Sequence, residues 1–171
     1  MTRSFVTLGA CALVVATSSL ALAQQPAAPA RAVSLALGME AVQAAIDTCS
    51  KDGFKVAGAI VDADGGQKVF LAADGASKGA VESSVKKATT SLKLKASTSD
   101  VLEKMKTDAA LKAKVEADPT LFVRPGGLLV MAGNDIIGAF GVGGVPGPGG
   151  GGVKDEACAK AGLDKIKDRI K

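Results

Sequence analysis

The chain has 171 residues and a formal net charge of +4, and 47% of its residues are hydrophobic. This length suits one globular domain rather than two large ones. Histidine, tyrosine and tryptophan are absent, which excludes Ser-His-Asp and Cys-His catalytic sites, zinc sites built on His, and haem ligated by His. Aromatic residues are few and the lysines are interleaved with acidic residues, so we do not expect nucleic acid as a partner.

The first residues are typical of a secretory signal peptide. Residues 1–23 have a short basic start, an apolar stretch and the small-residue motif ALA at 21–23. Cleavage before Gln24 would place the mature protein in the periplasm or outside the cell. Residues 24–33 are rich in Pro and Ala and predict a flexible leader, and residues 34–171 then form a single domain. No later stretch is apolar for long enough to span a membrane.

The first half of the domain predicts a helix, a hairpin and a second helix. Ser34 is a suitable N-cap for a first helix, whose apolar residues recur at spacings of three and four. Two apolar strands over 56–62 and 68–73 flank a turn that contains two glycines, which is typical of a β-hairpin. Ser77 is then placed to cap a long second helix.

The second half predicts another helix, a second hairpin and a final helix. A polar helix is expected over 101–117, with Asp100 as its cap. Strands over 128–132 and 136–142 surround a Gly-Asn-Asp turn, and a short further strand is expected near 121–123. A glycine-rich loop leads to a helix over 154–170. The sequence therefore predicts an α+β domain with an antiparallel sheet of about five strands covered by helices, in the order α-ββ-αα-βββ-α.

Export leaves Cys49 and Cys158 in an oxidising compartment. Cys49 is expected near the end of the first helix and Cys158 near the start of the last. Antiparallel packing of these helices would bring the two thiols together as a disulfide. The alternative is two buried free thiols, since cysteine is often a small core residue.

Three stretches of the sequence resemble one protein family. They are AIVDADGGQKVFLAADGASKGAVESSVKKATTS at 59–91, PGGLLVMAGNDIIGAFGVGG at 125–144 and DEACAKAGL at 155–163. Their order and spacing resemble those of the GlcG/HbpS-type haem-binding (haem-degrading) family, a module also found as the C-terminal domain of PduO-type proteins. The resemblance covers roughly 35–170. It implies a profilin-like antiparallel sheet, assembly into tetramers or octamers, and haem as a possible cofactor.

The resemblance also implies roles that this sequence supports only in part. Some extracellular relatives are haem or redox sensors beside a histidine kinase. Members of the family commonly carry an Arg just before the Asp-Gly-Ala element, whereas Leu71-Ala72-Ala73 stand there in this chain. A ligand contact that rests on that Arg is therefore not expected here.

The Asp-Gly-Ala element is the first candidate for ligand binding. Asp74, Gly75 and Ala76 lie between a predicted strand and a predicted helix, where backbone amides can form a nest for a carboxylate such as a haem propionate. The alternative is a plain turn in which Asp74 caps the helix. On that helix, Lys87 could pair with a propionate and Thr90 could offer a weak oxygen ligand. The alternative for this pair is a solvated face with Thr90 packed inward.

Four glycines complete the candidate site. Gly126 and Gly127 precede a predicted strand, and Gly143 and Gly144 follow one, so both pairs allow the close approach of a ligand or another subunit. They form neither a dinucleotide-binding fingerprint nor a phosphate-binding loop.

Conventional metal ligands are scarce in the sequence. Met39, Met105 and Met131 are soft iron ligands by type, although methionine on a helical stripe usually belongs to the core. Asp62 and Asp64 could bind a metal, although two such carboxylates are also common in turns. We therefore predict no metal site, and no set of residues points to catalysis.

The sequence predicts an exported protein that binds haem or a related tetrapyrrole, for haem handling or sensing. One alternative is an enzyme or binding protein for a small hydroxy-acid metabolite. Another is an oligomeric module that contacts a membrane sensor or redox partner. Haem degradation is implied only by the name of the family, so whether the protein is an enzyme stays open.

Overall fold

In the computed structural model, the structure is described for residues 32–147 and 151–170. The predicted signal peptide (1–23) and most of the predicted leader (24–33) lie outside these residues. Val33, the last residue of that leader, is buried in the core. Among the described residues, no helix is both long and apolar enough to cross a membrane.

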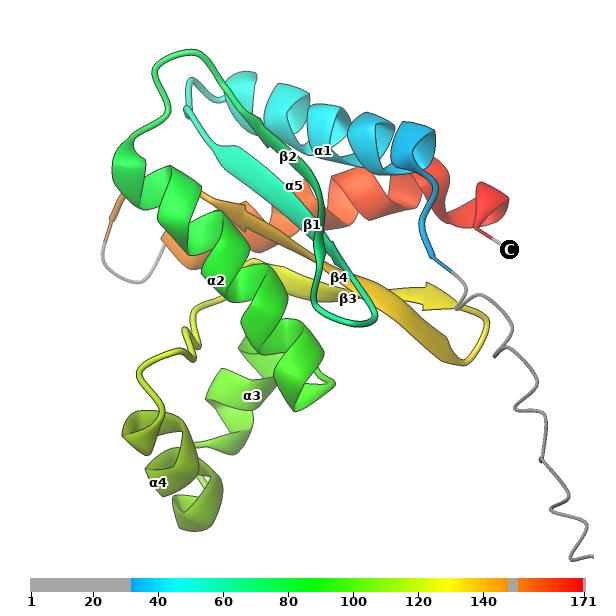
Figure 1. Ribbon diagram of the computed structural model, residues 1–171. Coiled ribbons are helices and arrows are strands. Elements are labelled where there is room, and N and C mark those ends of the chain that lie inside the picture. The colour runs from blue at the N-terminus through cyan, green and yellow to red at the C-terminus, as the bar shows by residue number, and fades with distance from the viewer. Residues whose placement is uncertain (1–31, 148–150, 171) are drawn as a thin grey trace, which may run out of the picture.

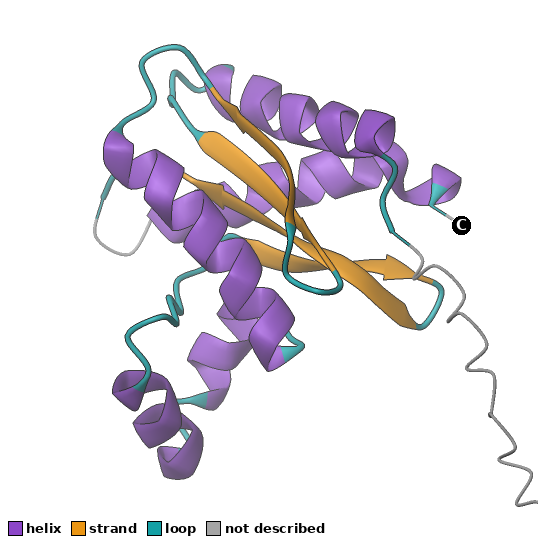
Figure 2. Ribbon diagram, viewed as in Figure 1, coloured by secondary structure: helices purple, strands orange, loops and turns teal. Residues whose placement is uncertain are grey.

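The domain is α+β, as predicted, with one antiparallel sheet between helices (Figure 2). The sheet has four strands in the order β2-β1-β4-β3, and every neighbouring pair is antiparallel. The strands are β1 (Ala57–Asp62), β2 (Gln67–Ala72), β3 (Gly127–Ala132) and β4 (Asp135–Gly143). The helices are α1 (Leu35–Ser50), α2 (Lys78–Leu94), α3 (Thr98–Lys104), α4 (Ala109–Ala117) and α5 (Gly151–Ile166), followed by the short 3₁₀ helix η1 (Lys167–Arg169).

The two faces of the sheet are covered differently (Figure 1). Helices α1 and α5 pack against each other and cover one face, where the main hydrophobic core surrounds the fully buried ring of Phe140. Helix α2 lies on the other face, over β1, β4 and β3. That second layer is thin because its residues are small: a Cβ atom added at Gly141 would lie 2.1 Å from the carbonyl oxygen of Ser84 on α2. The backbone of α2 therefore lies almost directly on β4.

The predicted caps of the two long helices are confirmed. The side chain of Ser34 accepts a hydrogen bond from the amide of Leu37 at the start of α1. The side chain of Ser77 accepts one from the amide of Ala80 at the start of α2. Both caps satisfy an amide that the helix itself leaves without a partner, which is why these helices begin where the sequence predicts.

Two predictions for the middle of the chain are wrong. Residues 121–123 do not form a strand; they are a loop, tied to α2 by the hydrogen bond from the amide of Phe122 to the hydroxyl of Thr90. The helix expected over 101–117 is two helices, α3 and α4. The side chain of Asp108 accepts a hydrogen bond from the amide of Leu111 and starts α4, because Asp favours a cap over a helix interior.

The cap of α3 also differs from the prediction. Ser97, rather than Asp100, is the N-cap, and its hydroxyl accepts a hydrogen bond from the amide of Asp100. Asp100 lies in the first turn instead, where its negative charge interacts favourably with the helix dipole.

The predicted pairing of Cys49 with Cys158 is confirmed as a disulfide. It joins the last turn of α1 to the middle of α5, with a Cα–Cα distance of 5.7 Å. The two cysteines are separated by 109 positions in the sequence, so the bond closes a loop that contains the whole sheet and α2. Such a long loop gives a large entropic constraint on the unfolded chain.

We expect reduction of this disulfide to lower the free energy of unfolding by about 4–5 kcal/mol, because the unfolded chain gains loop entropy. Denaturant unfolding with and without reductant measures the effect. The double variant Cys49→Ala/Cys158→Ala is the control, and reductant should not change its stability. Equal midpoints for the oxidised and reduced wild-type protein would contradict the prediction.

Candidate functional site

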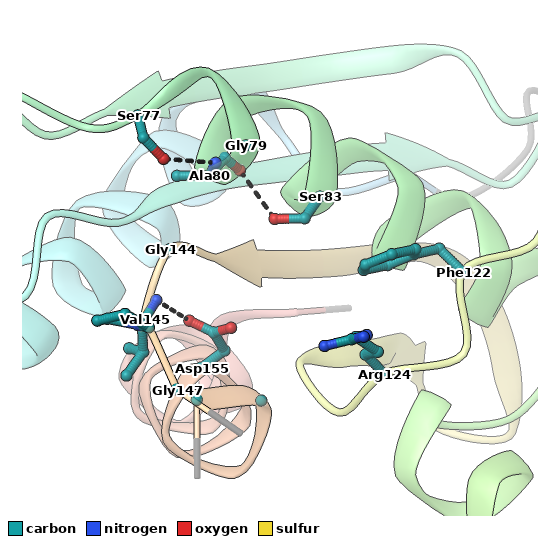
Figure 3. Close-up of a pocket in the computed structure, with 13 residues that line it drawn as sticks. Ser77, Gly79, Ala80, Ser83, Phe122, Arg124, Gly144, Val145, Gly147 and Asp155 are labelled. Atoms are coloured by element: carbon teal, nitrogen blue, oxygen red, sulfur yellow. Dashed lines mark hydrogen bonds between the residues drawn. The ribbon is translucent and has the colours of Figure 1, made fainter. Parts of the chain in front are cut away.

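A cleft of about 330 Å³ opens at the end of the sheet where α2 and α5 both begin (Figure 3). Four segments meet there: the first turns of α2, the loop that precedes β3, the segment after β4, and the first turns of α5. The residues that line the cleft are Ser77, Gly79, Ala80, Ser83, Phe122, Arg124, Gly144, Val145, Pro146, Gly147, Gly151, Gly152 and Asp155.

The electrostatic character of the cleft is set by the two helix starts. The N-terminus of a helix carries a partial positive charge and amides without partners in the helix, and both favour an anion. Neither the first turn of α2 nor that of α5 carries an acidic side chain. Arg124 adds a full positive charge, with its guanidinium carbon 5.8 Å from the centre of the Phe122 ring. The cleft thus combines positive potential with one aromatic surface.

A buried ion pair lies behind one wall of the cleft. Lys87 on α2 donates a hydrogen bond from Nζ to Oδ2 of Asp155 on α5 at 2.6 Å, and both side chains are 3% exposed. The same Nζ donates to the carbonyl oxygen of Val142 on β4 at 2.9 Å. On its other side, Asp155 accepts hydrogen bonds from the amides of Val145, at 3.0 Å, and Gly144. The pair therefore joins α2, β4 and α5 directly behind the cleft.

Burial dominates the titration of both partners. Burial raises the pKa of Asp155 above its ordinary value and lowers the pKa of Lys87. Their mutual attraction opposes both shifts, and the amides of Gly144 and Val145 also favour the charged carboxylate. The donors around Asp155 therefore offset part of the cost of burying its charge.

The backbone around the pair is built from residues that leave room for it. Gly126 has φ of +122°, and a Cβ there would lie 2.9 Å from Nζ of Lys87 and 3.0 Å from Cβ of Asp155. Its amide donates to the carboxylate of Glu156, which also accepts from the hydroxyl of Ser99. Any larger residue at this position would collide with the ion pair.

The comparisons with known proteins agree with this fold. A family model described as haem degrading protein HbpS-like matches residues 33–164. The chain belongs to the HbpS-like family. No curated protein matches it.

Three solved structures illustrate the likeness. HbpS is 30% identical, with a TM-score of 0.69 over 89% of this chain and 99% of the other. A double mutant of Streptomyces reticuli HbpS is 29% identical, with a TM-score of 0.70 over 91% and 98%. PduOC in complex with haem is 24% identical, with a TM-score of 0.68 over 79% and 95%, and this level of identity shows the shared fold alone.

The Asp-Gly-Ala element of this HbpS-like chain lies just before the cleft rather than in its lining. Asp74 and Gly75 are exposed, and the amide of Ala76 donates to the carbonyl oxygen of Ala73, which closes a turn. The alternative in which Asp74 caps α2 is wrong, because Ser77 occupies that position. A ligand contact at Asp74, Gly75 and Ala76 stays a prediction.

Neither Lys87 nor Thr90 lies on a solvated face of α2, because both side chains are buried. Lys87 was expected on an exposed face or facing a propionate, but its ammonium group is buried and engaged with Asp155 and Val142. Thr90 packs inward, as the alternative interpretation of the sequence predicted. Its hydroxyl accepts a hydrogen bond from the amide of Phe122 at 2.8 Å. Both side chains thus shape the cleft from behind without lining it.

The four candidate glycines allow α2 and the sheet to approach each other. A Cβ at Gly127 would lie 2.4 Å from the carbonyl oxygen of Lys87, and one at Gly143 would lie 2.1 Å from Oγ of Ser83. Gly126 makes room for the ion pair, as described above. Only Gly144, with φ of +134°, also lines the cleft.

The interpretations of Met39, Met131 and Asp62 can also be compared with the structure. Met39 and Met131 are 46% and 39% exposed, so placing them in the core was wrong. Neither they nor Met105 line the cleft. Asp62 stabilises its turn, since its Oδ1 accepts from the amides of Asp64 and Gly66. Among the described residues, no group of three or more Cys, Asp or Glu could hold a metal ion.

Of the residues that line the cleft, the sequence interpretation named Gly144 alone as a ligand contact, and the residues that it missed include Ser83, Phe122, Arg124 and Asp155. Phe122 fell in a segment expected to be a strand. Asp155 lay in a family motif, but no role was assigned to it. A signal was available for Arg124, because it immediately precedes Pro125 and Gly126, and this pair favours an irregular loop that can present a side chain.

We expect Lys87→Met to lower the free energy of unfolding by about 3–5 kcal/mol, because the carboxylate of Asp155 would stay buried without its cation. Adding Asp155→Asn should restore much of the loss, since Asn keeps an acceptor for the amides of Gly144 and Val145. Urea unfolding measures both variants. Lys106→Met is the matched control, because its exposed pair with Glu103 should contribute less than about 1 kcal/mol. Equal losses at both lysines would rule out the special role of the buried pair.

Proposed function

We propose that the cleft binds haem or a related tetrapyrrole by its carboxylate groups. The observation that carries the proposal is the convergence of two helix starts and Arg124 on one cleft whose own carboxylate, Asp155, is already paired with Lys87. A propionate would therefore meet positive potential and no uncompensated negative charge from Asp155. The ring of Phe122 offers an apolar surface beside it.

Membership in the HbpS-like family supports the same ligand class. The family is described as haem degrading, and HbpS itself is 30% identical to this chain. PduOC, which shares the fold, has been solved as a complex with haem. These names describe those proteins, and they make haem the first ligand to test here.

The residues of the cleft fit the carboxylates of haem but not its iron. The chain has no histidine or tyrosine, and the residues that line the cleft include no methionine or cysteine. Bound haem would supply redox chemistry at its iron, yet this cleft offers the metal no conventional side-chain ligand. We therefore propose binding through the ligand's periphery and derive no step of haem degradation.

The size of the cleft keeps one alternative open. A volume of about 330 Å³ lies at the lower end of the range for small-molecule pockets. It has room for a whole small hydroxy-acid, whereas a porphyrin would project from it. The same donors would recognise the carboxylate in either case, so the test must distinguish the two ligands.

We expect Arg124→Ala to weaken haem binding about tenfold, as for the loss of one hydrogen bond to a charged group. Absorbance titration of the Soret band measures the affinity. Haem dimethyl ester, which lacks free carboxylates, should bind the wild-type protein more weakly, and Arg124→Ala should reduce that preference. Lys112→Ala, at an exposed site on α4, is the control and should bind as the wild type does.

Two results would contradict the haem proposal. One is equal affinity of the wild-type protein for haem and its dimethyl ester. The other is a flat titration together with thermal stabilisation by glycolate or lactate that depends on Arg124, and this result would favour the hydroxy-acid alternative.

We also propose that the protein is exported and handles or senses haem outside the cytoplasm. The signal-like sequence at 1–23 supports export, and the disulfide between Cys49 and Cys158 is the kind of bond that persists in an oxidising compartment. Mass spectrometry of the protein recovered from the periplasm or medium should give a chain that begins at Gln24. An uncleaved chain confined to the cytoplasm would contradict export.

A further inference from the structure

The segment that carries Phe122 and Arg124 into the cleft has no regular secondary structure of its own. Residues 121–126 form a loop between α4 and β3, and Arg124 is exposed on this loop. Figure 3 shows the side chains of Phe122 and Arg124 next to each other on the same side of the cleft. A loop of this kind keeps a fixed position only where other elements hold it.

Thr90 of α2 holds the first part of the segment. Its side chain is fully buried, and its hydroxyl accepts a hydrogen bond from the amide of Phe122 at 2.8 Å. The carbonyl oxygen of Phe122 in turn accepts a hydrogen bond from the amide of Arg124 at 3.0 Å. Two successive hydrogen bonds therefore connect the interior of α2 to the backbone of Arg124.

Glu156 of α5 holds the last part of the segment. Its Oε2 accepts a hydrogen bond from the amide of Gly126 at 3.2 Å, and its Oε1 accepts one from the hydroxyl of Ser99 on α3 at 2.8 Å. Pro125 fixes its own φ and keeps the preceding Arg124 away from helical conformations. Arg124 therefore lies between two held positions, two residues from each.

We propose that Thr90 and Glu156 are positioning residues, which hold Arg124 where its guanidinium meets the carboxylate of the ligand. The inference rests on the proposed function of the cleft. Neither Thr90 nor Glu156 lines the cleft, so both act through Arg124. An exposed arginine loses rotamer freedom when it binds a carboxylate, and a backbone that is already held adds no further cost of ordering the loop.

The preference for haem over its dimethyl ester tests the role of Thr90, because a purely structural loss would weaken both ligands equally. Thr90→Val removes the acceptor and keeps the size of the side chain. It should lower the preference about three- to tenfold, with the loss for Arg124→Ala as the upper limit. Thr90→Ser should restore the preference. Thr89→Val is the matched control, because the hydroxyl of Thr89 donates to carbonyl oxygens of its own helix.

Glu156 allows positioning to be separated from charge. Removing a carboxylate near the cleft should by itself favour an anionic ligand, so charge alone predicts that Glu156→Met raises the preference for haem over the ester. Positioning predicts the opposite, namely a fall. Glu156→Gln removes the same charge but keeps an acceptor oxygen for the amide of Gly126, so it should not lower the preference.

Amide hydrogen exchange of the unliganded protein tests the same inference without a ligand. The amides of Phe122 and Arg124 should exchange faster in Thr90→Val than in the wild type. The amide of Ala73, which donates to the carbonyl oxygen of Val56, should exchange at the same rate in both and reports that the sheet is intact.

Three results would overturn the positioning role. They are unchanged exchange at Arg124 in Thr90→Val, an unchanged preference in both Thr90→Val and Glu156→Met, and an equal loss from Thr90→Val when Arg124 is already alanine, since the effect must pass through Arg124. A wild-type protein without any preference for haem over the ester contradicts the proposed function instead. In that case exchange at Arg124 alone decides whether Thr90 holds the segment.

Discussion

The ion pair between Lys87 and Asp155 determines the geometry of the cleft. It connects the middle of α2 to the first turns of α5 and also binds the backbone of β4 and of the segment that follows it. Burying two charges costs free energy, so such a pair is weak evidence for stability by itself. The pair instead fixes how the elements are arranged. The donors around Asp155 are all satisfied only in one relative orientation of α2, β4 and α5, and this orientation brings the starts of α2 and α5 to the same cleft.

The same pair explains why the cleft favours anions although it contains a carboxylate. The amides of Gly144 and Val145, with the ammonium group of Lys87, form the kind of concave donor site that binds anions, and Asp155 already occupies it. Under the proposed function, an incoming carboxylate would therefore bind farther out, near the start of α2 and Arg124. Asp155 thus serves as a structural anion of the chain itself, and the position proposed for a ligand is separate from it.

The sequence predicted the features of this fold that depend on local patterns. The caps Ser34 and Ser77, both hairpins and the proximity of Cys49 and Cys158 follow from spacing and turn residues. The buried role of Lys87 could not be predicted in this way, because its partner is 68 positions away and lysine on a helix usually indicates solvent. Phe122 was missed for a related reason, because its amide is held by Thr90 of a helix 32 positions away in the sequence.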